Sequence, residues 1–141
     1  MIEFLVWTLL LYWIHRLGHK SAWLMKFHGD HHRYANQNII RWSWKNLFFY
    51  TDTRKSTIDL WLTEVFPTIL FCVIIQSWWI LAFYWIWAAF IQEIVEHNEN
   101  ISIPFWSSGK WHLIHHQNPR VNFGLFFTLW DVVFNTNESV K

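Results

Sequence analysis

The sequence predicts an all-α integral membrane protein with a short N-terminal span, a transmembrane helical hairpin and a cytosolic helical cap rich in histidine. Three observations lead to this fold class. Of the 141 residues, 53% are hydrophobic and 15% are charged, whereas about a quarter of the residues in a soluble domain are charged. No lysine or arginine lies between Ser56 and Gly109. The nine histidines lie on either side of this apolar stretch, in regions 15–32 and 97–116.

Length and charge narrow the classes of protein further. The length suits a single domain, residues 1–141. The formal net charge is +1, which gives no general basic field, so we expect no nucleic-acid partner. Aromatic residues make up 21% of the chain and there is one cysteine, which excludes a disordered chain and a disulfide scaffold.

The first predicted element is the apolar segment Met1–Ile14, in which Glu3 and Thr8 are the exceptions. As a helix it covers about 21 Å, which is short of the roughly 30 Å hydrocarbon core. We expect a short span that thins the bilayer or continues as a helix into the next segment. A half-inserted helix is the alternative.

The segment 35–50 follows the first histidine-rich region and mixes asparagine and basic residues with isoleucine, tryptophan and phenylalanine. Such amphipathic sequence is typical of the membrane surface. The run 51–57 is a polar connector to the main apolar stretch.

The main apolar stretch predicts a hairpin with spans at about 59–75 and 77–96. The 28 residues from Val65 to Gln92 carry no charge, a length that allows one tilted span or two short ones. Two spans are favoured because Gln76-Ser77 offers a turn, and because one crossing would put the histidine regions on opposite membrane faces. The positive-inside rule places both flanks, and the histidines with them, on the cytoplasmic side.

The histidines fall into four places along the chain. They form H-x3-H at His15 and His19, H-x2-H-H at His28, His31 and His32, a lone His97, and a second H-x2-H-H at His112, His115 and His116. On a helix, positions i, i+3 and i+4 lie within about 100° of arc, so each motif presents its imidazoles to one side. Imidazole binds iron, zinc, copper and nickel. Nine imidazoles are more than one ion can bind, so the motifs predict two ions.

The competing interpretation of the clustered histidines is a pH-sensing or surface patch, but stray surface histidines would not repeat one spacing twice. A lone histidine is ordinarily a hydrogen-bonded core residue. We expect His97 to be a ligand because it follows the hairpin directly. Asp131 and Asp30 are candidates to hold a ligand imidazole through its second nitrogen, and for Asp30 a solvated or capping role is the alternative.

The order of these motifs resembles the membrane-bound fatty acid hydroxylase/sterol desaturase superfamily. Asn-Phe-Gly at 122–124 and Trp-Asp-Val-Val-Phe-Asn-Thr at 130–136 are similar to the family's Asn-(aromatic)-Gly and Trp-Asp-x-x-Phe-Gly-Thr. Asn135 departs from the usual glycine, and Val132-Val133 replaces a pair that is often basic-apolar. The resemblance extends from about residue 11 to residue 136.

This resemblance implies a multi-pass membrane enzyme in which all nine histidines bind two irons at the cytoplasmic face. Such enzymes activate molecular oxygen and hydroxylate or desaturate a C–H position of a fatty acyl chain, sterol or related lipid. The chain has no haem-attachment signature, so electrons would come from a separate haem protein or ferredoxin. Sterol-acting members have more spans before the first motif, so either a helical pair is missing here or a second copy of the chain supplies those contacts.

Two other functions compete with the lipid oxidase. A carotenoid ring hydroxylase is also short, histidine-clustered and membrane-bound, but the H-x3-H spacing and the Trp-Asp ending favour the fatty acid/sterol branch. A non-catalytic membrane protein that stores or moves zinc or iron is the rival from another class. Transport is disfavoured because the histidine motifs lie outside the predicted spans.

Overall fold

The computed structural model describes residues 1–37 and 40–138, and of Glu93 the backbone alone. Residues 38–39 of the expected membrane-surface segment therefore lie outside the described residues. Every regular element in these ranges is a helix, and an isolated β-bridge joins Trp106 to Phe127. The prediction of an all-α fold is confirmed.

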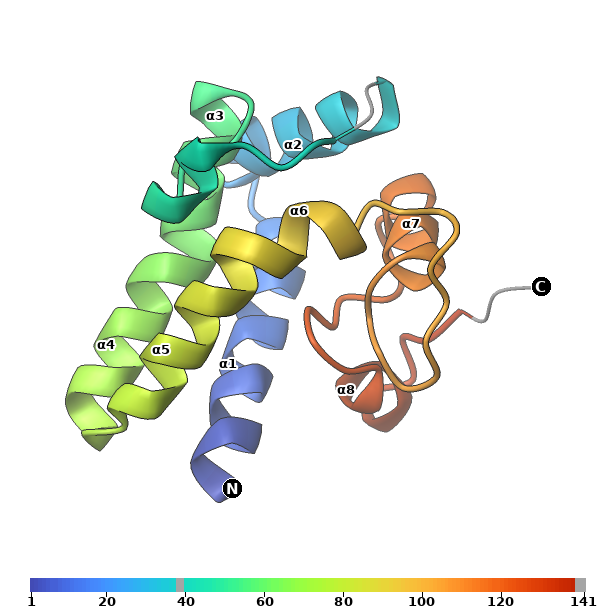
Figure 1. Cartoon of the computed structure of the whole chain (residues 1–141). Coiled ribbons are helices and arrows are strands. Elements are labelled where there is room, and N and C mark those ends of the chain that lie inside the picture. The colour runs from blue at the N-terminus through green and yellow to red at the C-terminus, as the bar shows by residue number, and fades with distance from the viewer. Residues whose placement is uncertain (38–39, 139–141) are drawn as a thin grey trace.

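The elements follow one another along the chain in the order shown in Figure 1. They are α1 (Ile2–Gly18), α2 (Met25–Gln37), the 3-10 helix η1 (Trp44–Phe48), α3 (Arg54–Leu60), the π-helix η2 (Trp61–Val65), α4 (Phe66–Ile75), α5 (Trp78–Ile86), the π-helix η3 (Trp87–Ile91), α6 (Gln92–Val95), α7 (Lys110–Gln117) and α8 (Leu129–Val133).

Helix α1 continues past the expected end at residue 14 and carries the first histidine motif at its C-terminal end. Trp7, Leu11 and His15 are buried and lie four residues apart, on one face of the helix. The Trp7 indole donates to Thr68 Oγ1 of α4 at 3.0 Å. The buried face that packs α1 against the hairpin therefore ends at His15, in the first histidine motif.

The hairpin is formed as predicted, with its turn at Gln76-Ser77. Elements α3, η2 and α4 make a helix of 22 residues, Arg54–Ile75, and the chain returns through α5, η3 and α6. Gln76 adopts a left-handed conformation with φ 57°. The Ser77 hydroxyl donates to Glu3 Oε2 at 2.5 Å and so joins the turn to the start of α1. Figure 1 shows α1, α4 and α5 side by side.

Both hairpin helices contain a π-helical turn, a local widening that is frequent at functional sites. The first, η2, ends just before Pro67, which has no N–H to donate to the Thr63 carbonyl. The widened turn thus lies directly N-terminal to this proline. Thr63 and Glu64 of η2 and Ala88 of η3 line one cavity.

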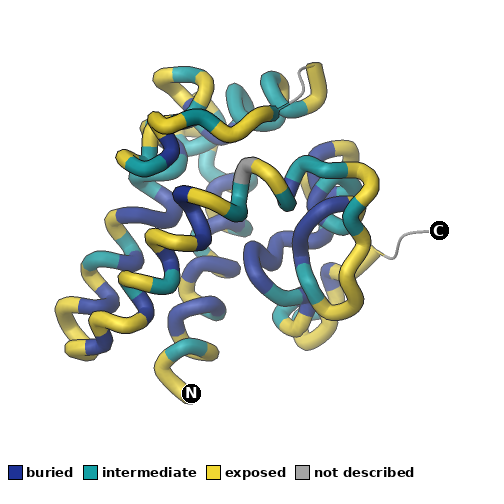
Figure 2. The backbone as a smooth tube through the Cα atoms, in the orientation of Figure 1, coloured by how far each residue is buried: buried dark blue, intermediate teal, exposed yellow. Residues whose placement is uncertain are grey.

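The outer faces of the long helices are apolar. Leu70 and Ile74 of α4 are exposed, as are Trp79 and Ile86 of α5. Figure 2 shows the exposed residues on the outer sides of these helices and the buried residues on the sides that face each other. Soluble monomers rarely expose apolar area on this scale. By length and composition, Arg54–Ile75 can cross a membrane, and Trp78–Ile91 is a shorter apolar helix.

The core lies where α1 and the hairpin meet the loop between α7 and α8. The Trp7 ring lies 4.8 Å from the Phe126 ring and 6.0 Å from the Tyr84 ring. The C-terminal end of α1, α2, the end of α6 and α7 gather at the same end of the molecule (Figure 1). The hairpin therefore returns the second histidine region to the first, as the sequence predicts.

Candidate metal centre

The nine histidines form two groups whose ligand nitrogens lie within 4.8 Å of one another in each group. The first group, the five-histidine group, contains His15, His19, His28, His32 and His115, and the second, the four-histidine group, contains His31, His97, His112 and His116. The groups are neighbours, since the rings of His32 and His116 stack at 4.3 Å. Every histidine singled out in the sequence lies in one of them.

Each H-x2-H-H triplet is divided between the two groups. His28 and His32 of α2 join the five-histidine group, whereas His31 joins the four-histidine group. In α7, His112 and His116 belong to the four-histidine group and His115 to the other. At 100° per residue, position i+4 lies 40° from i, whereas i+3 lies 60° away on the other side. The i, i+4 pair therefore faces one group and the i+3 member the other.

Gly109 fixes the start of α7 against the chain that follows His97. Its N–H donates to the Glu96 carbonyl at 3.1 Å, and the Lys110 N–H donates to the Ile101 carbonyl at 2.9 Å. Its φ is +63°, and a Cβ here would lie 2.2 Å from the Ile101 oxygen. Only glycine fits this approach, which places His97 against His112 with 4.9 Å between ring centroids.

Three imidazoles of the five-histidine group are held through their outer nitrogens. His15 Nδ1 donates to the Phe123 carbonyl at 2.8 Å, and His115 Nδ1 donates to the Val121 carbonyl at 2.7 Å. His28 Nδ1 bonds Asp59 Oδ2 of α3 at 2.8 Å. A proton on each Nδ1 leaves the Nε2 lone pair directed inward, as in histidines that bind metals.

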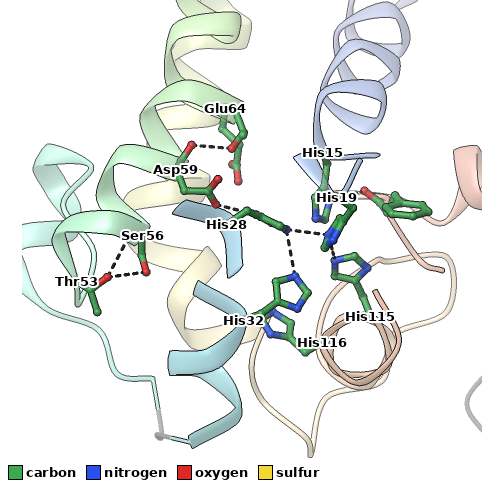
Figure 3. A network of polar contacts seen from close by, with 12 residues as sticks. His15, His19, His28, His32, Thr53, Ser56, Asp59, Glu64, His115 and His116 are labelled. Atoms are coloured by element: carbon green, nitrogen blue, oxygen red, sulfur yellow. Dashed lines mark hydrogen bonds and ion pairs between the residues drawn. The ribbon is translucent and has the colours of Figure 1, made fainter. Parts of the chain in front are cut away.

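The inner nitrogens converge, as Figure 3 shows for the labelled histidines. His19 Nε2 lies 2.9 Å from His115 Nε2 and 2.8 Å from His28 Nε2, which in turn lies 3.1 Å from His32 Nε2. Because His28 and His115 carry their protons outward, both direct an Nε2 lone pair at His19 Nε2, which has at most one proton to share between them, whereas a cation would satisfy both. Metal–nitrogen bonds of about 2.0–2.1 Å put opposite ligands about 4 Å apart, which fits a group within 4.8 Å.

The four-histidine group has nitrogens that nothing else in the described part of the chain satisfies. Both nitrogens of His97 are buried without a hydrogen-bond partner, as are Nδ1 of His112 and Nδ1 of His116. His112 and His116 approach through their Nε2 atoms at 2.9 Å. Buried polar atoms without partners are destabilising, and a bound metal ion would satisfy one nitrogen of each ring.

Burial keeps these imidazoles uncharged at neutral pH. Desolvation lowers the pKa of His19 to about 2, with repulsion from His115 and His32 as further causes. Desolvation likewise lowers the pKa of His32 and of His97 to about 4. The neutral form carries the free lone pair that a metal needs.

The two predicted supporting acids are placed differently from the expectation. Asp131 accepts from the backbone N–H groups of Phe123 and Gly124 at 2.7 and 2.9 Å and from Thr136 Oγ1 at 2.8 Å. It therefore holds the loop whose carbonyl binds His15, and acts on the imidazole indirectly. Asp30 accepts from Thr53 Oγ1 at 2.7 Å and pairs with Arg33, so it joins α2 to the start of α3.

The acid that does bond an imidazole is Asp59, which is not one of the two acids predicted from the sequence. Its carboxylate is buried at the head of the hairpin and bonds His28, 31 residues earlier in the chain. An ionisable residue at the start of an apolar helix is a functional signal in membrane proteins. The position of Asp59 could therefore have been noticed in the sequence, but its pairing with His28 could not.

A cavity of about 50 Å³ adjoins both groups. His15 and His28 of the five-histidine group line it, together with His31, His97 and His112 of the other. The wall contributed by the hairpin and the α7–α8 loop includes Leu60, Thr63, Glu64, Ala88, Gln92 and Leu125. The buried Glu64 carboxylate accepts from the Tyr84 hydroxyl at 3.3 Å and from Gln92 Nε2 at 3.4 Å.

The fold and the site together define an all-helical, histidine-cluster protein with two adjacent groups of imidazoles suited to metal ions. The sequence model of the fatty acid hydroxylase family matches residues 1–136. The chain belongs to the fatty acid hydroxylase family, which confirms the resemblance carried by the histidine motifs.

The curated relatives carry names of sterol-oxidising enzymes. The chain is 25% identical to cholesterol 25-hydroxylase-like protein 1, member 2, of Danio rerio, over 99% of this chain and 48% of the relative. It is also 25% identical, over 96% of this chain and 48% of the relative, to a Dictyostelium discoideum protein provisionally named as a methylsterol monooxygenase. The chain thus spans about half the length of these relatives. No solved structure matches it.

Proposed function

We propose that this protein is a membrane-bound, di-iron, oxygen-dependent oxidoreductase that hydroxylates or desaturates a lipid C–H position. The observation that carries the proposal is the pair of adjacent histidine groups in a chain of the fatty acid hydroxylase family. All nine histidines would serve as ligands, five for one ion and four for the other.

Iron accounts for this ligand set better than structural zinc. A structural zinc site is closed and four-coordinate, whereas the first group offers five imidazoles. Octahedral ions would keep one open position at the five-histidine group and two at the four-histidine group. Bound iron would supply oxygen activation at these positions. Hydroxylation consumes one O2, two electrons and two protons, and yields the alcohol and one water.

The chain's own residues position the ligands and exclude water. The carbonyls of Val121 and Phe123 and the carboxylate of Asp59 orient three imidazoles. The cavity beside both groups is where the reacting carbon would lie. The apolar outer faces of α4 and α5 support insertion in a membrane, with the histidine cap at the cytoplasmic surface.

The family and the names of the relatives support a proposal for the substrate class. A fatty acyl chain, a sterol or a related lipid is proposed, and the sterol names of the relatives disfavour a carotenoid ring. Electrons would come from a separate haem protein or ferredoxin.

One experiment tests the function through both groups. Purified protein reconstituted with ferrous iron is expected to hold about two irons per chain and to incorporate 18O from 18O2 into a lipid detected by mass spectrometry. His31→Ala and His115→Ala, one from each group, should each abolish the labelled product, whereas Arg41→Ala, outside both groups, should retain it. Full lipid oxidation by both histidine variants, or stable zinc loading without oxygen uptake, would contradict the proposal.

A further inference from the structure

A basic cleft opens beside the five-histidine group and shares no lining residue with the cavity described above. It has a volume of about 300 Å³ and is lined by Arg16, His19, Lys20, Pro119, Arg120 and Phe123. Three of these six residues are cations and none is an acid. Lys20 and Arg120 are exposed and Arg16 is half-buried. Among the described residues, none of the three cations forms an ion pair, since the two ion pairs are His28–Asp59 and Arg33–Asp30.

The cleft reaches the metal ligands directly. His19 lines it, is half-buried, and places its Nε2 within 2.9 Å of both His28 Nε2 and His115 Nε2. Phe123 also lines it, and the Phe123 ring lies 5.5 Å from the His115 ring and 5.6 Å from the His19 ring. A group seated in the cleft would therefore be separated from a bound ion by the His19 imidazole, or by the Phe123 ring and one imidazole.

Arg16, the half-buried cation of the cleft, is held in place by its neighbours. Its guanidinium donates to the Tyr12 hydroxyl at 3.2 Å and lies 5.0 Å from the Trp13 ring centroid and 5.7 Å from the Phe123 ring centroid. A fixed cation loses little conformational entropy when an anion binds. Lys20 and Arg120 at the rim would attract a negatively charged partner from a distance.

We propose that this basic cleft is the docking surface for an acidic one-electron carrier protein. The inference rests on the proposed function, which needs two electrons per turnover. The chain has no haem-attachment signature, so a separate protein would have to deliver them. With iron held by the histidines, each docking would oxidise the carrier by one electron and reduce one ferric ion to ferrous, so a turnover would take two dockings. Charge complementarity selects an acidic carrier, and the short path through His19 and Phe123 favours an electron donor over an anionic lipid headgroup.

The test measures binding and reduction separately. The probes are a soluble acidic [2Fe–2S] ferredoxin, the acidic haem domain of a b-type cytochrome, and a basic c-type cytochrome. The acidic carriers should bind the metal-free protein in detergent and reduce the iron-loaded protein in stopped-flow spectroscopy, with both effects weakening as salt is added. The double variant Lys20→Glu/Arg120→Glu should slow reduction by the acidic carriers about tenfold or more.

A matched control and a chemical reductant keep the outcomes distinct. Arg54→Glu/Lys55→Glu changes the net charge equally at exposed positions outside the cleft and should leave reduction unchanged. Dithionite should reduce the parent protein and both double variants at the same rate, and the iron contents of these three proteins should be equal. Failure of dithionite or of iron binding would count against the proposed function, not the docking surface.

Three results would overturn the docking surface. One is equal reduction rates for both double variants, and another is reduction of the parent protein by the basic cytochrome as fast as by the acidic carriers. The third is loss of binding to vesicles of phosphatidylserine by the cleft variant, with reduction unaffected, which would make the cleft a lipid headgroup site.

Discussion

Asp59 lies one turn into the first helix of the hairpin, and its carboxylate bonds the imidazole of His28 in another helix. Replacement by asparagine keeps an oxygen that can accept from Nδ1 but removes the negative charge that strengthens the ligand. We expect Asp59→Asn to weaken iron binding about 10–100-fold, measured by competition with a chelator.

Asp30 provides the control for this substitution, since it bonds Thr53 and Arg33 rather than an imidazole. Asp30→Asn should lower the melting temperature slightly and leave iron affinity unchanged. Equal losses of affinity in the two variants would show that the Asp59 bond has no special role.

The buried histidines also predict how the metal-free protein responds to acid. Their folded-state pKa values, about 4 for His32 and His97 and about 2 for His19, lie below the ordinary value of about 6.5. Between these values the unfolded chain binds more protons than the folded one. The contribution of these histidines to stability should therefore fall steadily as the pH drops below about 6.5.

Thermal unfolding of the metal-free protein between pH 8 and 4.5 checks this expectation. His97→Gln removes one of the titrating groups and should make the acid slope shallower. A melting temperature that rises as the pH falls from 6.5 would have the wrong sign.

At the scale of the elements, the backbone contact at Gly109 sets the position of α7 relative to His97. A Cβ at this position meets the Ile101 carbonyl, and its φ of +63° is unfavourable for other residues. Gly109→Ala should cost about 2 kcal/mol or more in stability and weaken iron binding, as read from chemical denaturation and iron analysis.

Gly18, near the end of α1, gives the opposite expectation. A Cβ there meets nothing within 4 Å, and alanine is the better helix former by about 1 kcal/mol. Gly18→Ala should therefore be neutral or stabilising. If it destabilises the protein as much as Gly109→Ala, the backbone contact at Ile101 is not the reason.

Most elements could be predicted from the sequence, because their signals are local. The apolar run of α1, the turn at Gln76-Ser77 and the return of both histidine regions to one end follow from composition and spacing. The division of each triplet into an i, i+4 pair and an i+3 member depends on how α2 and α7 face each other, which spacing within one helix cannot show. The bonds of His28 to Asp59 and of His15 to Phe123 join residues 31 and 108 positions apart, so no local pattern encodes them.

At the scale of the whole molecule, the two histidine groups join the ends of elements that the core does not hold together. The apolar core connects α1, the hairpin and the α7–α8 loop. Helix α2 contributes three histidines to the two groups, and one of them, His28, is the only one of its described residues that is buried. Removing the metal should therefore loosen the histidine cap before the hairpin. Hydrogen exchange after chelation should accelerate in α2 and α7 and stay slow in α4 and α5.

A protein reloaded with iron is the control, and it should regain protection in α2 and α7. Uniform acceleration across all helices would show that the ions stabilise the whole fold instead of its cap.

The division of each triplet between the two groups also has a consequence for how iron would fill the proposed centre. Because α2 and α7 each donate to both groups, the first ion to arrive fixes the helices that the second ion requires. Because the first ion would already have ordered α2 and α7, the second ion would lose less conformational entropy on binding and would bind more tightly than it would alone. For the proposed di-iron centre we therefore expect cooperative loading: when iron is scarce it should collect in pairs, and a limited supply should yield fewer complete centres rather than many half-filled ones.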